Sequence, residues 1–362
     1  MNTLRLEPPF EPRYCPRPSC PMYRREIPRF WSPAGVHANH AKGQWIRRFH
    51  CRFCDRTFSS QTFRVDYWDK KPLLNELVFD RLSQSGGLRE TARRLQGQIS
   101  RRGLVCKSRK LQRQLEPLHG NALGRFRPDA EFSLDELVTH EADRVACPLT
   151  LPILIETHSM LVIAASSAPI APFKRNERRR RARIAAAEAQ DGPRPHEDAA
   201  VVRRVLQVLE PHVRDREVLT FRTDKKPLYA VVLREVFGAN RVRHLVYDTR
   251  PGKRVGSPLF RINLTAAMVR DLEPRLRRRS WLAAKRARWL NASLMSVLVY
   301  RNYVRRRLNR DPREHTPAVL AGLLRGPLTL AECVRWRQDF GEVSALPNSR
   351  DGRESWAAMR AG

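Results

Sequence analysis

The chain has 362 residues, and its 69 Lys and Arg against 37 Asp and Glu give it a formal charge of +32 at pH 7. A charge this large opposes compaction unless a polyanion neutralises it, which favours nucleic acid as a partner. No stretch reaches the roughly 18 apolar residues of a membrane span and the N-terminus has no apolar signal segment, so nothing supports a membrane-spanning or secreted protein and a cytoplasmic one is expected.

Two cysteine pairs open the chain, Cys15 with Cys20 and Cys51 with Cys54. Two close pairs of thiolates carried on two turns are typical of a tetrahedral Zn²⁺ site. The alternatives are free thiols or two disulfides, and three nearby histidines are either substitute ligands or surface residues: His37, His40 and His50. Residues 1–68 are rich in Pro, Arg and aromatics, and we expect them to form a zinc ribbon that needs its metal to fold.

Residues 69–125 change to a helical pattern. Apolar residues recur at helical spacing from Leu73 to Leu82, Gly86 and Gly87 interrupt them, and a second helix begins at Leu88. A third helix is expected over the Arg-rich segment 101–118. Three short helices with a glycine turn and a basic last member predict a helix-turn-helix, although a generic basic helical bundle has a similar pattern.

From residue 131 the pattern becomes that of an α/β domain. Three consecutive strands are expected at 131–139, 147–155 and 159–165, followed by a basic insertion over 171–198 that is a solvated loop or a frayed helix. A helix at 199–213, a strand at 217–224, a helix at 227–236 and a strand at 242–248 come next, and mostly helical sequence runs from 262 to 310. The predicted fold is a mixed five-stranded sheet with helices over 131–310, and residues 311–362 form a C-terminal helical tail.

Two acids stand out in this domain. Asp135 lies on the first strand and Asp224 at the end of the fourth, and strands in this order are neighbours in a mixed sheet. Their carboxylates could share a metal centre of hard oxygen ligands, which suits Mg²⁺ or Mn²⁺. The alternative is that each acid lies on a solvated face.

Taken together, these segments resemble zinc-ribbon insertion-sequence transposases with an RNase H-like DDE catalytic domain. The resemblance spans nearly the whole chain: the cysteine ribbon, the segment 88–95, Leu134-Asp135-Glu136-Leu137 as a first-acid motif, Thr223-Asp224 with Tyr229 as a second, and the segment 262–281 as a third-acid helix. It implies a nucleoid-associated enzyme that acts on double-stranded DNA, both transposon ends and target, and that works as a homodimer.

The third catalytic position departs from the family pattern. Asn263 stands where Glu is usual, and Arg270 keeps the basic position seven residues on, on the same helix face. An Asn carbonyl can ligate Mg²⁺ but adds no charge, so either the second metal binds weakly or the copy is inactive. Asp271 and Asp248 are possible substitutes, one about 100° off that helix face and the other after a strand not usually catalytic.

The resemblance implies hydrolysis of a phosphodiester at the transposon end, followed by attack of the freed 3′-hydroxyl on target DNA. Asp135, Asp224 and Asn263 would be catalytic, and the expected DNA contacts are Arg89, Arg93, Arg101, Arg102, Lys107, Arg109, Arg270 and Arg278. Two other functions remain open: a decayed or domesticated transposase that binds DNA without cleaving it, and an RNase H-like nuclease acting on RNA or junctions.

Overall fold

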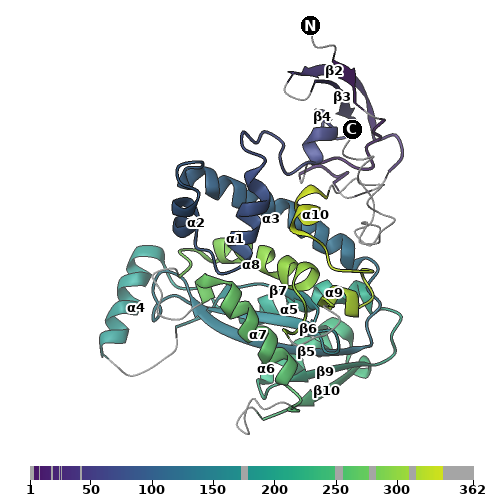
Figure 1. Ribbon diagram of the computed structural model, residues 1–362. Coiled ribbons are helices and arrows are strands. Elements are labelled where there is room, and N and C mark those ends of the chain that lie inside the picture. The colour runs from purple at the N-terminus through teal and green to yellow at the C-terminus, as the bar shows by residue number, and fades with distance from the viewer. Residues whose placement is uncertain are drawn as a thin grey trace.

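The structure is a computed structural model. It describes residues 4–7, 9–17, 19–23, 25, 27–40, 43–172, 178–248, 256–276, 283–309 and 315–336. A small β-sheet lies at one end of the molecule, a larger sheet at the other, and helices fill the space between them (Figure 1). The chain is a mixed α/β protein, as the sequence pattern predicted.

The N-terminal sheet has four strands and an aromatic core. Its strands are β1 (Arg5–Leu6), β2 (Trp31–Asn39), β3 (Gln44–Cys51) and β4 (Arg56–Ser59), and a 3₁₀ turn, η2 (Ser60–Phe63), follows. Strand β3 pairs antiparallel with β2 and β4 and parallel with β1. Phe30, Phe49, Phe58 and Phe63 are buried together beside the cysteines. A hydrophobic core of this size is small, and domains with such small cores usually need a bound metal or disulfides to be stable.

Three helices follow, as predicted: α1 (Leu74–Ser83), α2 (Leu88–Arg94) and α3 (Arg101–Leu123). The turn between α1 and α2 requires glycine at position 86, because a Cβ there would lie 2.0 Å from the Arg81 carbonyl oxygen. The hydroxyl of Ser100 caps α3 by accepting from the Gly103 amide at 3.1 Å. Helix α3 runs five residues beyond its predicted end at 118.

The larger sheet contains β5 (Glu131–His140), β6 (Pro148–Glu156), β7 (Val162–Ala165), β8 (Ala168–Pro169), β9 (Leu219–Thr223) and β10 (Val242–Val246). The strand order is β10-β9-β5-β6-β7, with β8 pairing β6. Strands β5, β6 and β7 are antiparallel neighbours, whereas β9 and β10 run parallel to β5. All five predicted strands and the predicted adjacency of the first and fourth are confirmed; the short β8 was not predicted.

Helices cover both faces of this sheet. On one face, α5 (Asp198–Leu209) and α6 (Pro227–Phe237) bury apolar residues against Phe132, Leu134 and Phe221. On the other, α7 (Phe260–Leu272) and α8 (Ala287–Val299) pack on Leu137 and Ile153. The remaining elements are α4 (Arg178–Asp191), η3 (Glu210–His212), η4 (Ala239–Arg241), η5 (Pro274–Leu276), the π-turn η6 (Tyr300–Val304), α9 (Pro317–Leu320) and α10 (Leu330–Arg335).

The helices α1–α3 and the sheet share one hydrophobic core. Leu104, Leu111 and Leu118 of α3 belong to the same buried cluster as Leu134 of β5 and Ile163 of β7. The α1–α2 turn is also tied to the far end of α7, because the Ser85 amide donates to the Leu272 carbonyl at 2.9 Å. None of the helices in the described residues is long and apolar enough to cross a membrane.

A buried histidine joins three elements of this core. His119 of α3 is enclosed, with Nε2 at 2.9 Å from the Ile163 carbonyl and Nδ1 at 2.7 Å from the Tyr303 hydroxyl. A carbonyl only accepts, so Nε2 carries the proton and Nδ1 accepts from the tyrosine. Burial lowers the pKa of His119.

We expect this histidine to make the fold sensitive to acid. Because its pKa is lower in the folded state, the unfolded chain binds the proton first as pH falls below about 6.5, and the free energy of unfolding decreases by up to about 1.4 kcal/mol per pH unit. Urea unfolding at pH 7.5 and 5.5 should show this loss in the wild-type protein and a smaller loss in His119→Gln. An equal loss in both would contradict the assignment.

Candidate functional site

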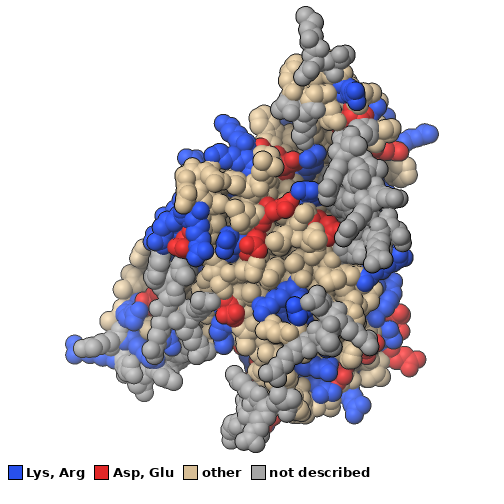
Figure 2. All heavy atoms as spheres, viewed as in Figure 1, with Lys and Arg blue, Asp and Glu red and all other residues tan. Residues whose placement is uncertain are grey.

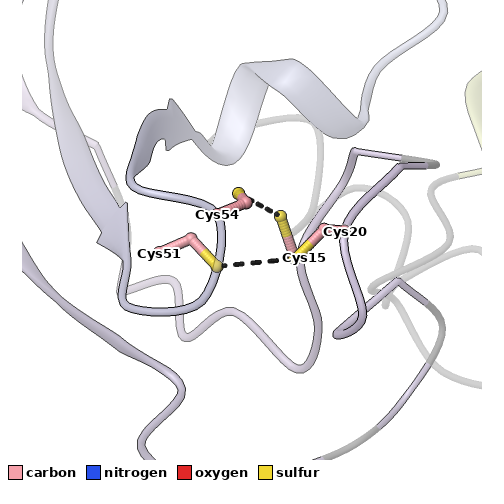
Figure 3. Close-up of side chains that lie close together, drawn as sticks. All are labelled: Cys15, Cys20, Cys51 and Cys54. Atoms are coloured by element: carbon pink, nitrogen blue, oxygen red, sulfur yellow. Dashed lines mark hydrogen bonds between the residues drawn. The ribbon is translucent and has the colours of Figure 1, made fainter.

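The four N-terminal cysteines come together in one cluster. The Sγ atoms of Cys15 and Cys54 are 3.8 Å apart, as are those of Cys20 and Cys51, and all four lie within 4.8 Å of one another (Figure 3). A tetrahedral site with Zn–S bonds of about 2.3 Å places its sulfurs about 3.8 Å apart. The cluster could therefore hold a zinc ion.

Two turns position these sulfurs. Cys51 ends β3, and its carbonyl accepts from the Asp55 amide at 3.0 Å, which closes the turn that carries Cys54. Cys15 and Cys20 lie on a loop closed by a 3.1 Å bond from the Cys15 amide to the Met22 carbonyl. The turns bring the two sequence pairs face to face, as the spacing predicted.

The surroundings of the four cysteines shift the pKa values of their thiols in different directions. Burial raises the pKa of Cys15 and of Cys54. At Cys51 burial acts in the same direction, but hydrogen bonds from the backbone of Phe53 and Cys54 outweigh it and lower the pKa. The nearby histidines do not join the cluster, and His50 instead contacts Asp55 at 2.8 Å.

The two predicted acids lie where the pairing of the central strands β5 and β9 ends, a place called here the acidic edge. Strands β5 and β9 pair in parallel up to Ser133 and Arg222, and Asp135 and Asp224 each come two residues later. Both carboxylates are close enough to Tyr229 for their charges to act on its hydroxyl. Both are half-buried.

Asp135 is on the sheet face that α7 covers, and Asp224 lies beyond the end of β9. Asp135 pairs directly with Ile153 of β6, which packs against α7, and directly paired residues share a face. Asp224 follows β9 directly and precedes α6, whose N-cap is Lys226. Each acid accepts a local amide hydrogen bond, Asp135 from Glu136 at 2.7 Å and Asp224 from Lys226 at 3.0 Å.

A charged network that the sequence did not reveal lies next to the acids. Lys226 donates to both oxygens of Glu136 at 2.8 Å and contacts Asp198 at 2.7 Å. Burial opposes the charge of Lys226, but Asp198 and Glu136 outweigh it and raise its pKa. Burial, reinforced by the charges of Glu136, Asp135 and Asp224, raises the pKa of Tyr229. Glu136 is therefore paired with Lys226, on the opposite face of the sheet from Asp135.

Asn263 lies in the first turn of α7. Its Nδ2 donates to the Leu259 carbonyl at 2.9 Å, so its carbonyl oxygen is the atom available to a cation. Its neighbours Leu259 and Ile262 pack with Leu137 of β5, on the face that carries Asp135.

Of the two substitute acids, Asp248 lies close to Asp224 in the chain fold but is paired with a lysine, and Asp271 lies far along α7 from Asn263. Asp248 pairs with Lys225 at 2.9 Å beyond the end of β10. Asp271 lies eight residues after Asn263, about 12 Å along the helix axis, where its carbonyl accepts from the Ser85 hydroxyl. Within the described part of the chain, the four cysteines are the only group of three or more His, Cys, Asp or Glu side chains close enough to hold a metal. The acidic edge therefore offers two carboxylates and an amide.

Most of the predicted DNA-contact residues are exposed on α2 and α3. On the face shown in Figure 2, basic side chains gather around α2. The exposed members are Arg89, Arg93, Arg101, Arg102 and Arg109. Arg93 also pairs with Glu90 at 3.1 Å, and the Arg109 guanidinium stacks over Trp289 at 4.5 Å. Arg270 is half-buried on α7, and Arg278 lies outside the described residues.

Lys107 is a correction to the predicted DNA contacts. Its residue is only 4% exposed, and its Nζ donates to Asp69 at 2.5 Å, the Lys71 carbonyl at 2.6 Å and Asn75 at 2.8 Å. Burial lowers the pKa of Lys107, and the attraction of Asp69 only partly offsets this effect. Burial acts to raise the pKa of Asp69, but hydrogen bonds from Lys107 and the Lys71 amide outweigh it and lower the pKa. An ammonium enclosed by three acceptors is not available to a phosphate, so we leave Lys107 out of the DNA-contact set.

Lys107→Met should therefore destabilise the fold rather than weaken DNA binding directly. Removing one partner of a buried ion pair leaves Asp69 uncompensated, and we expect a loss of about 3–5 kcal/mol in the free energy of unfolding. Adding Asp69→Asn should recover part of it, and the exposed Lys70→Met is the matched control. Urea unfolding measures all four proteins; a Lys107→Met variant of wild-type stability would contradict the structural role.

Comparisons with known proteins do not assign a family. No protein-family model matches the chain, and no curated protein matches it significantly. The arguments for function therefore come from the cysteine cluster, the acidic edge and the basic helices.

Proposed function

We propose that the chain is a DNA transposase that binds the ends of its element and catalyses metal-dependent strand cleavage and strand transfer. One observation carries the proposal: Asp135 of β5 and Asp224, which directly follows β9, each come two residues after the last pair of these neighbouring parallel strands, and both charges act on Tyr229. Two adjacent carboxylates at a strand edge suit the binding of Mg²⁺ or Mn²⁺ between protein and phosphate oxygens.

The topology supports this proposal. Three antiparallel strands followed by two strands parallel to the first, in the order β10-β9-β5-β6-β7, match the expectation for an RNase H-like sheet. The four-cysteine unit fits a zinc ribbon, and α1–α3 fit a helix-turn-helix with a basic surface. The formal charge of +32 suits a partner dense in phosphate.

In this mechanism the main role of the protein is to place carboxylates around a divalent cation and arginines beside the DNA phosphates. Asp135 and Asp224 would hold the divalent cation, and the Asn263 carbonyl would add a neutral oxygen. Such a cation polarises a scissile phosphate and makes a bound hydroxyl more acidic. Arg270, seven residues along α7, would neutralise a neighbouring phosphate, and the exposed arginines of α2 and α3 would hold the duplex by its backbone. Two DNA ends must meet for strand transfer, which favours a homodimer.

A catalytically inactive DNA-binding protein is the second candidate. It is favoured by the acidic edge itself, where the described residues provide two carboxylates and the amide of Asn263 rather than three acids. An amide ligand lowers the negative charge available to a second cation. This protein would keep its DNA-binding helices and its cysteine unit without strand cleavage.

A single experiment separates these proposals. The purified protein is incubated with a labelled duplex containing the end sequence of its element, at several salt concentrations and with Mg²⁺ or Mn²⁺. An active transposase binds with an affinity that falls steeply with salt and then nicks or joins the labelled strand. Binding without any strand cleavage would favour the inactive protein, and the absence of duplex binding would refute both.

A further inference from the structure

A groove on the N-terminal sheet lies outside both candidate metal sites. It has a volume of about 290 Å³ and is lined by β2, β3, β4 and the segment leading to α1. Among its lining residues are Arg48, Thr57, Gln61, Tyr67 and Trp68. A volume at the lower end of the range for small-ligand sites suits one nucleotide-sized group.

Trp68 is the unusual member of this groove. Its side chain belongs to a residue that is 82% exposed, and its backbone is in the left-handed region with φ of 53°. Left-handed backbone is costly for a bulky residue, and such strain is concentrated at functional sites. The Tyr67 ring makes a T-shaped contact with the indole, with ring centroids 6.0 Å apart, and most of the large flat apolar surface of Trp68 remains in water.

Helix α3 holds the residues on either side of Trp68 in the chain. Lys110 of α3 donates to the Tyr67 carbonyl at 2.6 Å, and Lys107 donates to the Asp69 carboxylate at 2.5 Å. The Asp69 amide also closes the turn by donating to the Asp66 carbonyl at 2.9 Å. The buried Lys107–Asp69 pair thus has a positioning role, because it fixes the strained turn that presents Trp68.

The rest of the groove has the chemistry of a base and its phosphate. Arg48 is exposed and donates to the Thr57 hydroxyl at 3.2 Å, which places a guanidinium beside the groove. Gln61 contributes an amide, and the buried Nδ1 of His37 has no hydrogen-bond partner. The Gln61 carbonyl oxygen accepts from the Asn39 side chain at 3.2 Å. A flat ring, a cation and the unsatisfied His37 nitrogen together fit a nucleobase that is stacked on the ring and contacted at its edge.

We propose that this groove binds an unpaired nucleotide of the DNA, with its base stacked on Trp68 and its phosphate beside Arg48. A base inside a duplex has no free face, so the ligand is a single-stranded tail or an extruded base. The inference rests on the proposed function and goes beyond it, because it assigns a site for unpaired DNA to the unit that carries the four cysteines.

The test compares a blunt duplex with the same duplex carrying a three-nucleotide single-stranded tail that contains 2-aminopurine. The wild-type protein should prefer the tailed duplex on the order of 10-fold and quench the 2-aminopurine fluorescence, as expected for base stacking on an aromatic ring. Trp68→Gly should lose both effects and keep the affinity for blunt duplex, since glycine accepts the left-handed backbone without strain. Trp68→Phe should keep the preference in part.

Trp45→Phe is the matched control, because Trp45 is a 40% exposed indole of the same sheet that does not line the groove. A Trp68→Gly protein that retains the tail preference would overturn the inference and leave the proposed function standing. So would a Trp68→Gly protein changed only in its oligomeric state, which would make the groove a protein interface. Failure of the wild-type protein to bind duplex, with Trp68-dependent binding of the free single strand retained, would instead refute the proposed function alone.

Discussion

Replacing Asp224 by Asn should abolish metal-dependent DNA strand cleavage while leaving duplex affinity within about twofold of wild type, because phosphate contacts by basic residues dominate that affinity. The substitution keeps the size of the side chain and removes its charge beside Asp135. Loss of several kcal/mol of transition-state stabilisation corresponds to a rate decrease on the order of 10³-fold. Single-turnover cleavage of a labelled end duplex in Mg²⁺ or Mn²⁺ measures it.

The same experiment has two internal controls. Asp135→Asn should be as inactive as Asp224→Asn, and the double variant should be no worse, because the two carboxylates act as one unit. Asp129→Asn changes an exposed acid just before β5 and should cleave at the wild-type rate. Wild-type cleavage by Asp224→Asn would place the reaction elsewhere.

Removing zinc should unfold the N-terminal sheet. The four sulfurs are spaced as a tetrahedral site requires, and apparent binding free energies of about 10–16 kcal/mol for structural zinc appear directly as folding free energy. We expect about one zinc per chain by elemental analysis. A strong chelator should abolish the near-ultraviolet circular dichroism of the aromatic cluster around Phe49 and Phe58.

Single substitutions separate this site from the other thiols. Cys51→Ser removes a buried ligand and should lose both the zinc and the aromatic signal. Cys106→Ser changes an exposed cysteine on α3 and should retain both. A protein purified without zinc that keeps its near-ultraviolet spectrum would show that the aromatic core folds without the metal.

Local patterns in the sequence were sufficient for the main elements. The run from Pro148 to Glu156 is apolar enough to predict a strand, and in the structure it is buried throughout between two helical layers. Cysteine spacing predicted the cluster because the two turns that carry the pairs are short and local. The basic segment after 171 was expected as a loop or frayed helix, and its Arg- and Ala-rich part forms α4, in line with the helix propensity of those residues.

Long-range pairings are what the sequence did not reveal. Lys107 looked like one more basic residue of α3, because its partner Asp69 lies 38 residues earlier. Lys226 and Glu136 are 90 residues apart, and only the pairing of β5 and β9 brings them together. The individual strands β2 and β3 were not predicted, because apolar and polar residues do not alternate cleanly in their sequences.

The hydrogen bond from the Ser85 amide to the Leu272 carbonyl ties the α1–α2 turn to α7, and α3 shares a hydrophobic core with the larger sheet. Under the proposed function, these contacts fix the distance between the DNA-binding helices and the two acids. DNA held by the basic helices meets the acidic edge at a fixed number of base pairs from the bound sequence. Five base pairs inserted between that sequence and the cleavage position would turn the scissile phosphate to the far side of the duplex, where the protein would still bind but could no longer cut.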